Sequence, residues 1–364
     1  MSKNLTLNIE QIKKDKDGLD VLSDIYIYAV LGERVSQEDL VRFKWYGIHA
    51  QEESKDLFEL KIPLPLGQLT LEQIKTLSLI SKEYAKNSLD ISKEQKIELK
   101  NLKIHDLPHV FNLLHNVNLS TIFESGHNVR NVITCPVNGI DATQIADVSE
   151  LAQKLNKAFI GNKNFSNLPN KLQIAVSGYA EGCALDYTPE VSFNAHKNEK
   201  GKILFSVKVI GEHLGFVTPS QVVNTARAIA KIYKDFGNRE DVEDSSFQSL
   251  VGSWGFVKFF DILDSSVTFR IKEDDIDDEE TVGRQPRLGI NESKVDGQSY
   301  IGCVVKNSQI GSAGLEKLAN LLEKYDASKI KLTHKGNIVI LDAPTKNADE
   351  FAKELHKVDF NPFN

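Results

Sequence analysis

One stretch of this chain occurs twice, and it limits what the chain can fold into. Residues Phe58–Leu99 align without a gap on Ser299–Ile340, at a constant offset of 241. In both copies a strand and a turn precede a helix with apolar residues every three to four positions, and a strand alternating with period two follows. The coinciding residues are Leu60 and Ile301, Ile74 and Leu315, Leu77 and Leu318, Ile80 and Leu321, Tyr84 and Tyr325, Ile91 and Leu332, Ile97 and Ile338, and Leu99 and Ile340. The repeat predicts two half-domains that bury their open faces against each other.

Local signals organise the rest of the chain. Ser36 with acidic residues behind it indicates a helix start, and Thr70 with Gln73 has the pattern of a capping box. Short apolar strands and glycine turns after Thr121 favour an α/β domain. We therefore expect a helical extension over 1–54, half-domain A over 55–120, an α/β domain over 121–215, a helical connector with an acidic linker over 216–282, and half-domain B over 283–364.

Composition excludes several classes of protein. The chain has 364 residues, enough for two or three domains, and 41% of them are hydrophobic. No run approaches the roughly 18 apolar residues of a membrane helix, and the N-terminal lysines are not followed by the apolar stretch of a signal peptide. We expect a cytoplasmic protein without a membrane partner. The net charge of −7 argues against nucleic acid as a partner.

The cysteines and the acidic run do not indicate a metal site. Cys135, Cys183 and Cys303 lie far apart and form no CxxC pair. Three thiols cannot supply the four ligands of a standard iron–sulfur cluster, and the spacing is not that of a zinc site. The acidic run over 273–280 is most simply a solvated linker. We predict no metal ligands in this chain.

Several motifs carry a resemblance to a known family. In order, they are RFKWYG, FELKIPLPLGQLT, GHNVRNV with CPVNGIDAT, SNLPNKLQIAVSG, and VGRQPRLGI with GQSYIG. This collinear set, over roughly residues 40–364, resembles the siroheme-dependent nitrite and sulfite reductases. The resemblance implies an α+β fold with two ferredoxin-like half-domains and a reductase-type α/β domain. It also implies six-electron reduction of nitrite or sulfite, with ferredoxin as donor and siroheme and a [4Fe–4S] cluster as cofactors.

The repeat and the resemblance together predict a truncated chain. Members of that family have two α/β domains, and the second one carries the cluster cysteines. At an offset of 241 from residue 121, the second domain would begin near residue 362 of a 364-residue chain. We therefore expect that the cluster domain is missing, and that a separate cluster-bearing chain would have to supply it.

The resemblance also implies four substrate-binding positions. Arg130 matches the arginine of the family's DNVRN motif, and Lys171 matches the first lysine of its SNLPRK motif. Lys61 stands where an arginine is expected, and Gln173 stands where sulfite reductases have lysine and nitrite reductases often have asparagine. Such groups polarise an oxyanion and deliver protons to it. Gln173 favours nitrite over sulfite.

The positions implied for siroheme are less basic than in the family. We expect Asn128, Asn131, Lys93 and Lys96 to contact the cofactor, whose eight carboxylates need several cations. However, Glu94 stands where the family has an arginine. Acidic residues also replace basic ones in the stretch over 241–249, and the arginine of SNLPRK is Asn170 here.

Three functions stay open on the sequence. The chain is a nitrite/sulfite reductase-like protein that is incomplete or inactive alone, or a non-catalytic paralogue acting as a binding or scaffold partner. The third is a module that binds a small anion or a tetrapyrrole without redox chemistry.

Overall fold

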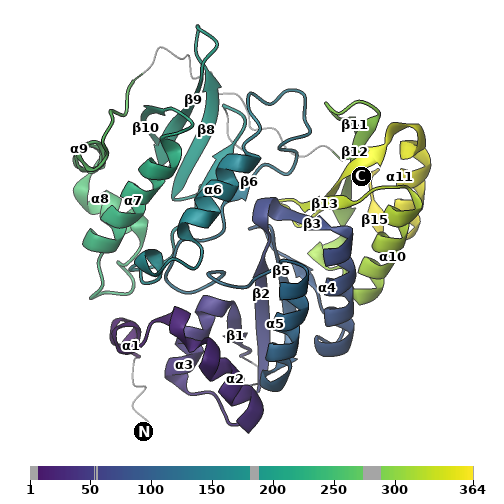
Figure 1. The fold of residues 1–364 in the computed structure, drawn as a ribbon, viewed down its shortest axis with the longest axis horizontal. Helices are drawn as coiled ribbons and strands as arrows, with labels where there is room; N and C mark the ends of the chain where they lie inside the picture. The colour runs from purple at the N-terminus through teal and green to yellow at the C-terminus, as the bar shows by residue number, and fades with distance from the viewer. Residues whose placement is uncertain (1–6, 53, 55, 181–187, 274–287, 364) are drawn as a thin grey trace.

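The fold consists of three sheets and the helices that cover them (Figure 1). The computed structural model describes residues 7–52, 54, 56–180, 188–273 and 288–363. In the view of Figure 1 the α/β domain lies at the upper left, half-domain A at the bottom centre and half-domain B at the right.

Half-domain A is a four-stranded sheet with two helices on one face. Its strand order is β1-β2-β5-β4, and α4 and α5 cover it. Alternation along β2 and β5 directs Phe58, Leu60 and Leu99 into the core, where they are almost fully buried. The bounds are β1 Ile48–Ala50, β2 Leu57–Pro63, β4 Asp90–Ile91, β5 Lys96–Lys103, α4 Leu71–Tyr84 and α5 Leu107–Asn116.

Half-domain B has the same plan, and a strand of half-domain A completes its sheet. The order is β11-β12-β14-β13-β3, with β15 also paired to β12. The bounds are β3 Gln68–Thr70, β11 Gly289–Glu292, β12 Gln298–Val305, β13 Lys329–Leu332, β14 Ile338–Pro344, β15 Phe360–Asn361, α10 Gly311–Lys324 and α11 Ala348–Lys357. One continuous hydrophobic core joins the two half-domains.

The predicted repeat is confirmed, and it extends further than its sequence signal. Helix α11 begins and ends at the positions of α5 shifted by the same offset. The halves also exchange pairings, since Gln68 lies opposite Lys331, and Gln309 bridges Asp90 at the equivalent positions. This reciprocal pairing relates the half-domains by an approximate twofold axis.

Each half has one close contact between two equivalent positions, and a glycine occupies one of the two positions in each case. In half-domain A the pair is Gly67 with Gln95, and in half-domain B it is Ser308 with Gly336. A Cβ on Gly67 would lie 2.8 Å from the side chain of Gln95, and a Cβ on Gly336 would lie 1.9 Å from the Ser308 hydroxyl. These two contacts are equivalent in the repeat. In half-domain A the retained side chain is that of Gln95, which is buried and donates a hydrogen bond of 2.8 Å to the Leu332 carbonyl.

The α/β domain has a five-stranded sheet of order β10-β9-β8-β7-β6. Its strands and helices α6 to α9 share one core, whose members run from Val129 to Ile271 and also include Leu66 of half-domain A. We therefore propose that this domain includes the segment expected to be a helical connector. The acidic run beyond Glu273 lies outside the described residues. The bounds are β6 Ile133–Thr134, β7 Ile174–Ser177, β8 Val191–Lys197, β9 Ile203–Val209, β10 Glu212–Val217, α6 Ser149–Phe159, α7 Val222–Phe236, α8 Phe247–Trp254 and α9 Phe256–Ser266.

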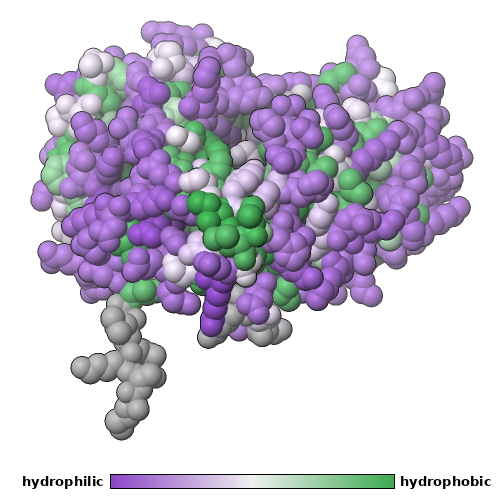
Figure 2. All heavy atoms as spheres, turned by 60° about the horizontal axis from the view of Figure 1, so that its bottom comes forward, coloured by the Kyte–Doolittle hydropathy of each residue, from purple (hydrophilic) through white to green (hydrophobic). Residues whose placement is uncertain are grey.

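The N-terminal segment forms helices α1 (Ile9–Asp15), α2 (Leu22–Leu31) and α3 (Gln37–Phe43). Ser36 caps α3, as predicted. Helix α2 leaves large apolar side chains exposed, including Ile27, Val30 and Leu31. Figure 2, which turns this side of the molecule forward, shows an apolar patch surrounded by mostly hydrophilic surface. Within the described residues, no helix is both long enough and apolar enough to cross a membrane.

The capping box at the start of α4 provides a test of the repeat's local stability. The Thr70 hydroxyl accepts a hydrogen bond from the Gln73 amide, and the Gln73 side chain accepts one from the Thr70 amide. We expect Thr70→Ala to lower the free energy of unfolding by about 1 kcal/mol, measured by urea denaturation, because the Gln73 amide at the helix start loses its acceptor. Thr70→Ser should retain most of that stability. An unchanged midpoint in the alanine variant would contradict the assigned cap.

Candidate functional site

The candidate site begins at the face of half-domain A that the helices leave uncovered. Lys61 on β2 pairs across the strands with Glu98 on β5, and His49 on β1 pairs with Glu59. Because side chains alternate along a strand, these residues and Lys96 share one face. This face is therefore polar and charged, whereas the other face forms the core.

The second copy carries fewer charged side chains on the equivalent face, where Lys331 lies opposite Val339. The positions equivalent to Glu59, Lys61 and Glu98 are Tyr300, Gly302 and Val339. Tyr300 and Val339 pack in a small apolar cluster with residues of the α/β domain. The other members of that cluster are Cys135, Val137, Tyr179 and Leu341. The charges of half-domain A are thus specific to this copy, as expected for a binding surface.

Five side chains of alternating charge meet beside this face. In order they are Arg130, Glu124, Lys96, Glu94 and Lys171. The Lys96 ammonium lies 2.7 Å from the Glu124 carboxylate and also pairs with Glu94, and the other oxygen of Glu94 lies 3.7 Å from the Lys171 ammonium. Glu124 and Lys96 are buried, while Lys171 is exposed. The cluster joins β5 and the preceding turn to two loops of the α/β domain.

Electrostatics within the cluster keep Lys96 charged. Burial lowers the pKa of Lys96, but the carboxylates of Glu124 and Glu94 outweigh it, so the net shift is upward. Burial raises the pKa of Glu124 more than Lys96 and Arg130 lower it. For Glu94, burial acts upward, but Lys96 and Lys171 bring the pKa below its ordinary value. Two carboxylates therefore compensate most of the positive charge that the sequence predicts here.

Arg130 is held by the loop that precedes it. Its guanidinium donates to the carbonyls of Phe123 and Gly126 and to the side chain of Asn128. Asn128 is fully buried and in turn donates 2.7 Å to the Ser125 carbonyl. The guanidinium has five donors, and these contacts use three of them.

Gln173 and Asn131 form contacts within the α/β domain and toward half-domain A. The Gln173 amide nitrogen donates 2.8 Å to the Asn131 carbonyl. The side chain of Asn131 donates 2.9 Å to the Leu64 carbonyl and accepts 2.8 Å from Asn156. These contacts position the loop of Arg130, and Gln173 itself is buried.

The N-terminal segment holds the loop that carries Lys171. Asp17 accepts hydrogen bonds from Ser166 and Asn167, and Trp45 donates 2.7 Å to the Ser166 carbonyl. Lys13 on α1 donates 2.9 Å to the Leu168 carbonyl, three residues before Lys171. The helical extension thus orients one of the cations expected at the site.

Two histidines next to the cluster were missed by the sequence reasoning. His49 lies 2.7 Å from the Ser125 hydroxyl, and His127 stacks on Trp45. Burial and surrounding cations lower the pKa of each histidine to about 3. For His49 those cations are Lys61, Lys44, Lys96 and Arg130, and for His127 they are Lys13, Arg130 and Lys44. Alternation along β2 puts Glu59 on the same face as Lys61. His49 lies opposite Glu59 on the neighbouring strand, so a predicted pairing of these two strands could have placed it there.

The residues expected to hold siroheme do not form a site that fits it. Asn128 and Asn131 use their side chains in hydrogen bonds within the protein, and Lys96 is paired with two carboxylates. Lys93 is exposed on the turn before β5. A cofactor with eight carboxylates would meet Glu94 and Glu124 together with these cations, which is unfavourable.

The described residues also lack a site for an iron–sulfur cluster. Cys135 and Cys303 are buried and far apart in sequence, and Cys183 lies outside the described residues. Burial raises the pKa of the Cys303 thiol to about 12, so it is not a thiolate at neutral pH. In the part of the chain that the structure describes, no three His, Cys, Asp or Glu side chains are grouped to hold a metal ion.

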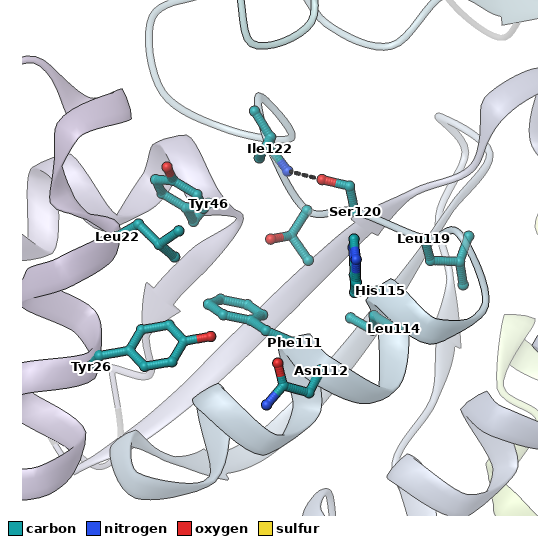
Figure 3. Close-up of a pocket in the computed structure, with 11 residues that line it drawn as sticks. Leu22, Tyr26, Tyr46, Phe111, Asn112, Leu114, His115, Leu119, Ser120 and Ile122 are labelled. Atoms are coloured by element: carbon teal, nitrogen blue, oxygen red, sulfur yellow. Dashed lines mark hydrogen bonds between the residues drawn. The ribbon is translucent and has the colours of Figure 1, made fainter.

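A separate apolar cavity of about 200 Å³ lies between α2 and α5 (Figure 3). Figure 3 shows the rings of Tyr26 and Phe111 facing it from the two helices, with Tyr46 behind them. None of the expected site residues lines it, and its lining among the described residues includes no lysine or arginine. It therefore offers an oxyanion no cationic partner.

Comparison with family models assigns the α/β domain and both half-domains to one family. Residues 125–270 match the model described as the nitrite and sulphite reductase 4Fe-4S domain. Residues 49–117 and 291–358 each match the nitrite/sulfite reductase ferredoxin-like half domain, which confirms the two half-domains. The first match runs past residue 215, in agreement with the core shared by α7 to α9.

Individual relatives align along nearly the whole chain. The assimilatory ferredoxin-dependent nitrite reductase of Haloferax mediterranei is 27% identical over 97% of this chain and 68% of its own length. The ferredoxin–nitrite reductase of Leptolyngbya laminosa is 29% identical over 89% of this chain and 67% of its own length. The Mycobacterium tuberculosis NirA structure superposes with a TM-score of 0.87 at 22% identity, covering 98% of this chain and 70% of that one. These alignments do not support the expectation of truncation.

Proposed function

Because the chain belongs to the nitrite and sulfite reductase family, we propose that its basic cluster binds a small oxyanion, nitrite or sulfite, for reduction. The observation that carries this proposal is the convergence of Lys61, Lys96, Arg130 and Lys171 on a face that has uncharged residues at the positions of Glu59, Lys61 and Glu98 in the other copy. Cations from two domains surround that face, as the polarisation of a bound oxyanion requires.

The chain's own residues have defined roles in this proposal. Lys61 and Lys171 are the more exposed cations and would contact the oxyanion, while Arg130 would stabilise its negative charge from a loop held by Asn128. Gln173 would position that loop through the Asn131 carbonyl. Lysine ammonium groups would also supply protons to the reduced oxygens.

Electrons would come from ferredoxin, as the names of the relatives state for those proteins. The described residues do not form a site that fits the family's siroheme or its [4Fe–4S] cluster. A [4Fe–4S] cluster takes four thiolate ligands, and this sequence has three cysteines. Its ligands would therefore have to include residues outside this sequence. The role proposed for this chain is restricted to holding, polarising and protonating the oxyanion.

A second candidate, a non-catalytic paralogue that binds a partner, is favoured by one observation. Glu94 and Glu124 already compensate Lys96 and Lys171 within the chain. Such a cluster has a structural role without any ligand, because removing one partner of a buried ion pair is strongly destabilising. The two candidates differ in whether a free oxyanion binds.

The experiment is equilibrium dialysis of the reduced, purified chain against ³⁵S-labelled sulfite, with unlabelled nitrite as competitor. We expect saturable binding that nitrite displaces and that equal ionic strength of chloride does not. Arg130→Met should weaken binding about tenfold, because it removes one charge-assisted contact. Arg270→Met is the matched control, since Arg270 is an exposed arginine that pairs with Asp264 and is not a member of the cluster. Absence of saturable binding would leave the non-catalytic paralogue.

A siroheme titration tests whether the chain binds this cofactor or not. The reduced chain is titrated with siroheme, and its absorption spectrum is followed in the Soret region. From the internally satisfied contacts of Asn128, Asn131 and Lys96, we expect no saturable shift at tens of micromolar. A saturable shift that weakens in Lys93→Met, which changes an exposed side chain, would show that the residues expected at the cofactor site accept siroheme.

A further inference from the structure

We propose that Glu94 is an internal counter-anion that competes with the bound oxyanion for Lys96 and Lys171, and so favours singly charged nitrite over doubly charged sulfite. This inference rests on the proposed function, because it concerns the same basic cluster. Glu94 lies between the two lysines, with one carboxylate oxygen toward each of them. An oxyanion that uses both lysines must take the place of this carboxylate or share the cations with it.

Glu94 is held in place by the turn that carries it. The turn is closed by hydrogen bonds from the Gln95 amide to the Ser92 carbonyl and from the Ser92 amide to the Lys96 carbonyl. Gln95 has a φ of +58° and its side chain is locked against Leu332 of half-domain B. The adjacent Thr134 amide of the α/β domain also donates to Gln95. Three parts of the fold therefore fix the turn, and with it the backbone of Glu94.

The position of Glu94 differs from that of Glu124. Glu124 is buried and its carboxylate pairs with Lys96. An anion from solvent therefore does not reach Glu124. The Glu94 side chain keeps 30% of its surface exposed, and its partner Lys171 keeps 48%. An anion from solvent can therefore reach the Glu94 end of the cluster, which is the end where competition would occur.

The charges of the cluster explain the expected selectivity. Arg130, Lys96 and Lys171 contribute three positive charges, and Glu94 and Glu124 contribute two negative ones. Lys61 is balanced by Glu98 at 3.5 Å. These five side chains thus carry one uncompensated positive charge, and Glu190 is a further carboxylate that acts on Arg130. Removing the charge of Glu94 leaves two, and a dianion gains more from this change than a monoanion does, since Coulomb energy scales with the charge of the ligand.

The test compares the natural chain with Glu94→Gln at pH 8, where sulfite is mostly a dianion. Equilibrium dialysis gives the dissociation constant for ³⁵S-sulfite, and nitrite competition gives the constant for the monoanion. We expect Glu94→Gln to tighten sulfite binding about tenfold and nitrite binding about threefold. The sulfite-to-nitrite affinity ratio should therefore rise about threefold. The control is Glu150→Gln on α6, an exposed glutamate paired with Lys154 at 2.6 Å, which should leave both constants unchanged.

The outcomes distinguish this inference from the proposed function. If the natural chain binds both anions and Glu94→Gln leaves the affinity ratio unchanged, Glu94 is only a structural ion-pair partner and the inference is wrong. If neither protein binds either anion, the proposed function fails and the inference fails with it. A second variant, Lys171→Met, tests the inference at an exposed residue, whose replacement should leave the fold unchanged. It should weaken sulfite binding and reduce the gain produced by Glu94→Gln.

Discussion

Replacing Lys96 by methionine should lower the free energy of unfolding by about 4 kcal/mol at pH 7. Methionine fills a similar volume, but it leaves the buried carboxylate of Glu124 without the ammonium that lies 2.7 Å away. Glu94 loses its closest cation in the same substitution. The cost of leaving a buried charge unpaired exceeds the net contribution of the intact pair, so this single change should be among the most damaging in the chain. Urea denaturation followed by circular dichroism measures the effect.

The pH dependence of this loss gives a second readout. Burial already raises the pKa of Glu124 above its ordinary value of 4.5, and loss of Lys96 should raise it further. A carboxyl whose folded pKa is raised stabilises the protein below its unfolded pKa, and this contribution is lost as the pH rises through the folded pKa. The difference between Lys96→Met and the natural chain should therefore shrink as the pH falls from 7 toward 5.

The double variant Lys96→Met with Glu124→Gln isolates the unpaired charge. It should recover at least half of the lost stability, because a neutral amide replaces the buried carboxylate. Lys100→Met is the control, since Lys100 lies on the same strand, pairs with Asp90 and is 43% exposed. It should cost no more than about 1 kcal/mol. If Lys96→Met were as mild as Lys100→Met, the buried ion pair would not exist as described.

The half-domains could be predicted from the sequence because their signals are local. Apolar spacing and the Thr70 capping box each depend on residues a few positions apart. The constant offset then repeats the apolar spacing in the second half-domain. Helix α11 was not predicted, because the aligned stretch ended at Ile340.

The extent of the α/β domain depends on contacts that no local signal reports. Phe247 and Phe259, on α8 and α9, pack in the same core as strands many residues earlier. Their periodicity predicts helices, but it does not tell which core those helices cover. A helical segment next to an acidic run was therefore interpreted as a connector.

The sequence indicated the cations of the proposed site but not the carboxylates that balance them. Arg130, Lys171 and Lys61 were identified by resemblance, and Glu94 was noted as a departure from it. The pairing of Lys96 with Glu124 joins a strand of half-domain A to a loop of the α/β domain, and only the tertiary fold brings them together. Likewise, the hydrogen bonds of Asn128 and Asn131 within the protein have no signature in sequence.

Acid should destabilise this protein by about 4 kcal/mol between pH 7 and pH 5, through His49 and His127 together. Both are held neutral in the folded state with a pKa of about 3, because burial and neighbouring cations oppose a further positive charge. In the unfolded chain each titrates at its ordinary value of 6.5. A histidine with a lowered folded pKa leaves stability intact above 6.5 and reduces it as the pH falls from 6.5 toward 3, by up to about 1.4 kcal/mol per pH unit.

Single variants should separate the two contributions. His49→Gln and His127→Gln each remove one titrating group, so the loss of stability between pH 7 and pH 5 should shrink by about 2 kcal/mol in each. His105→Gln, which removes an exposed histidine, should keep the loss seen in the natural chain. The free energy of unfolding is measured in urea at both pH values for all four proteins. A loss that is equal in His49→Gln and the natural chain would mean that His49 accepts a proton in the folded state. Nearby carboxylates would then offset the charge of the cations around His49 more completely than Glu94 and Glu124 do in the five-residue cluster.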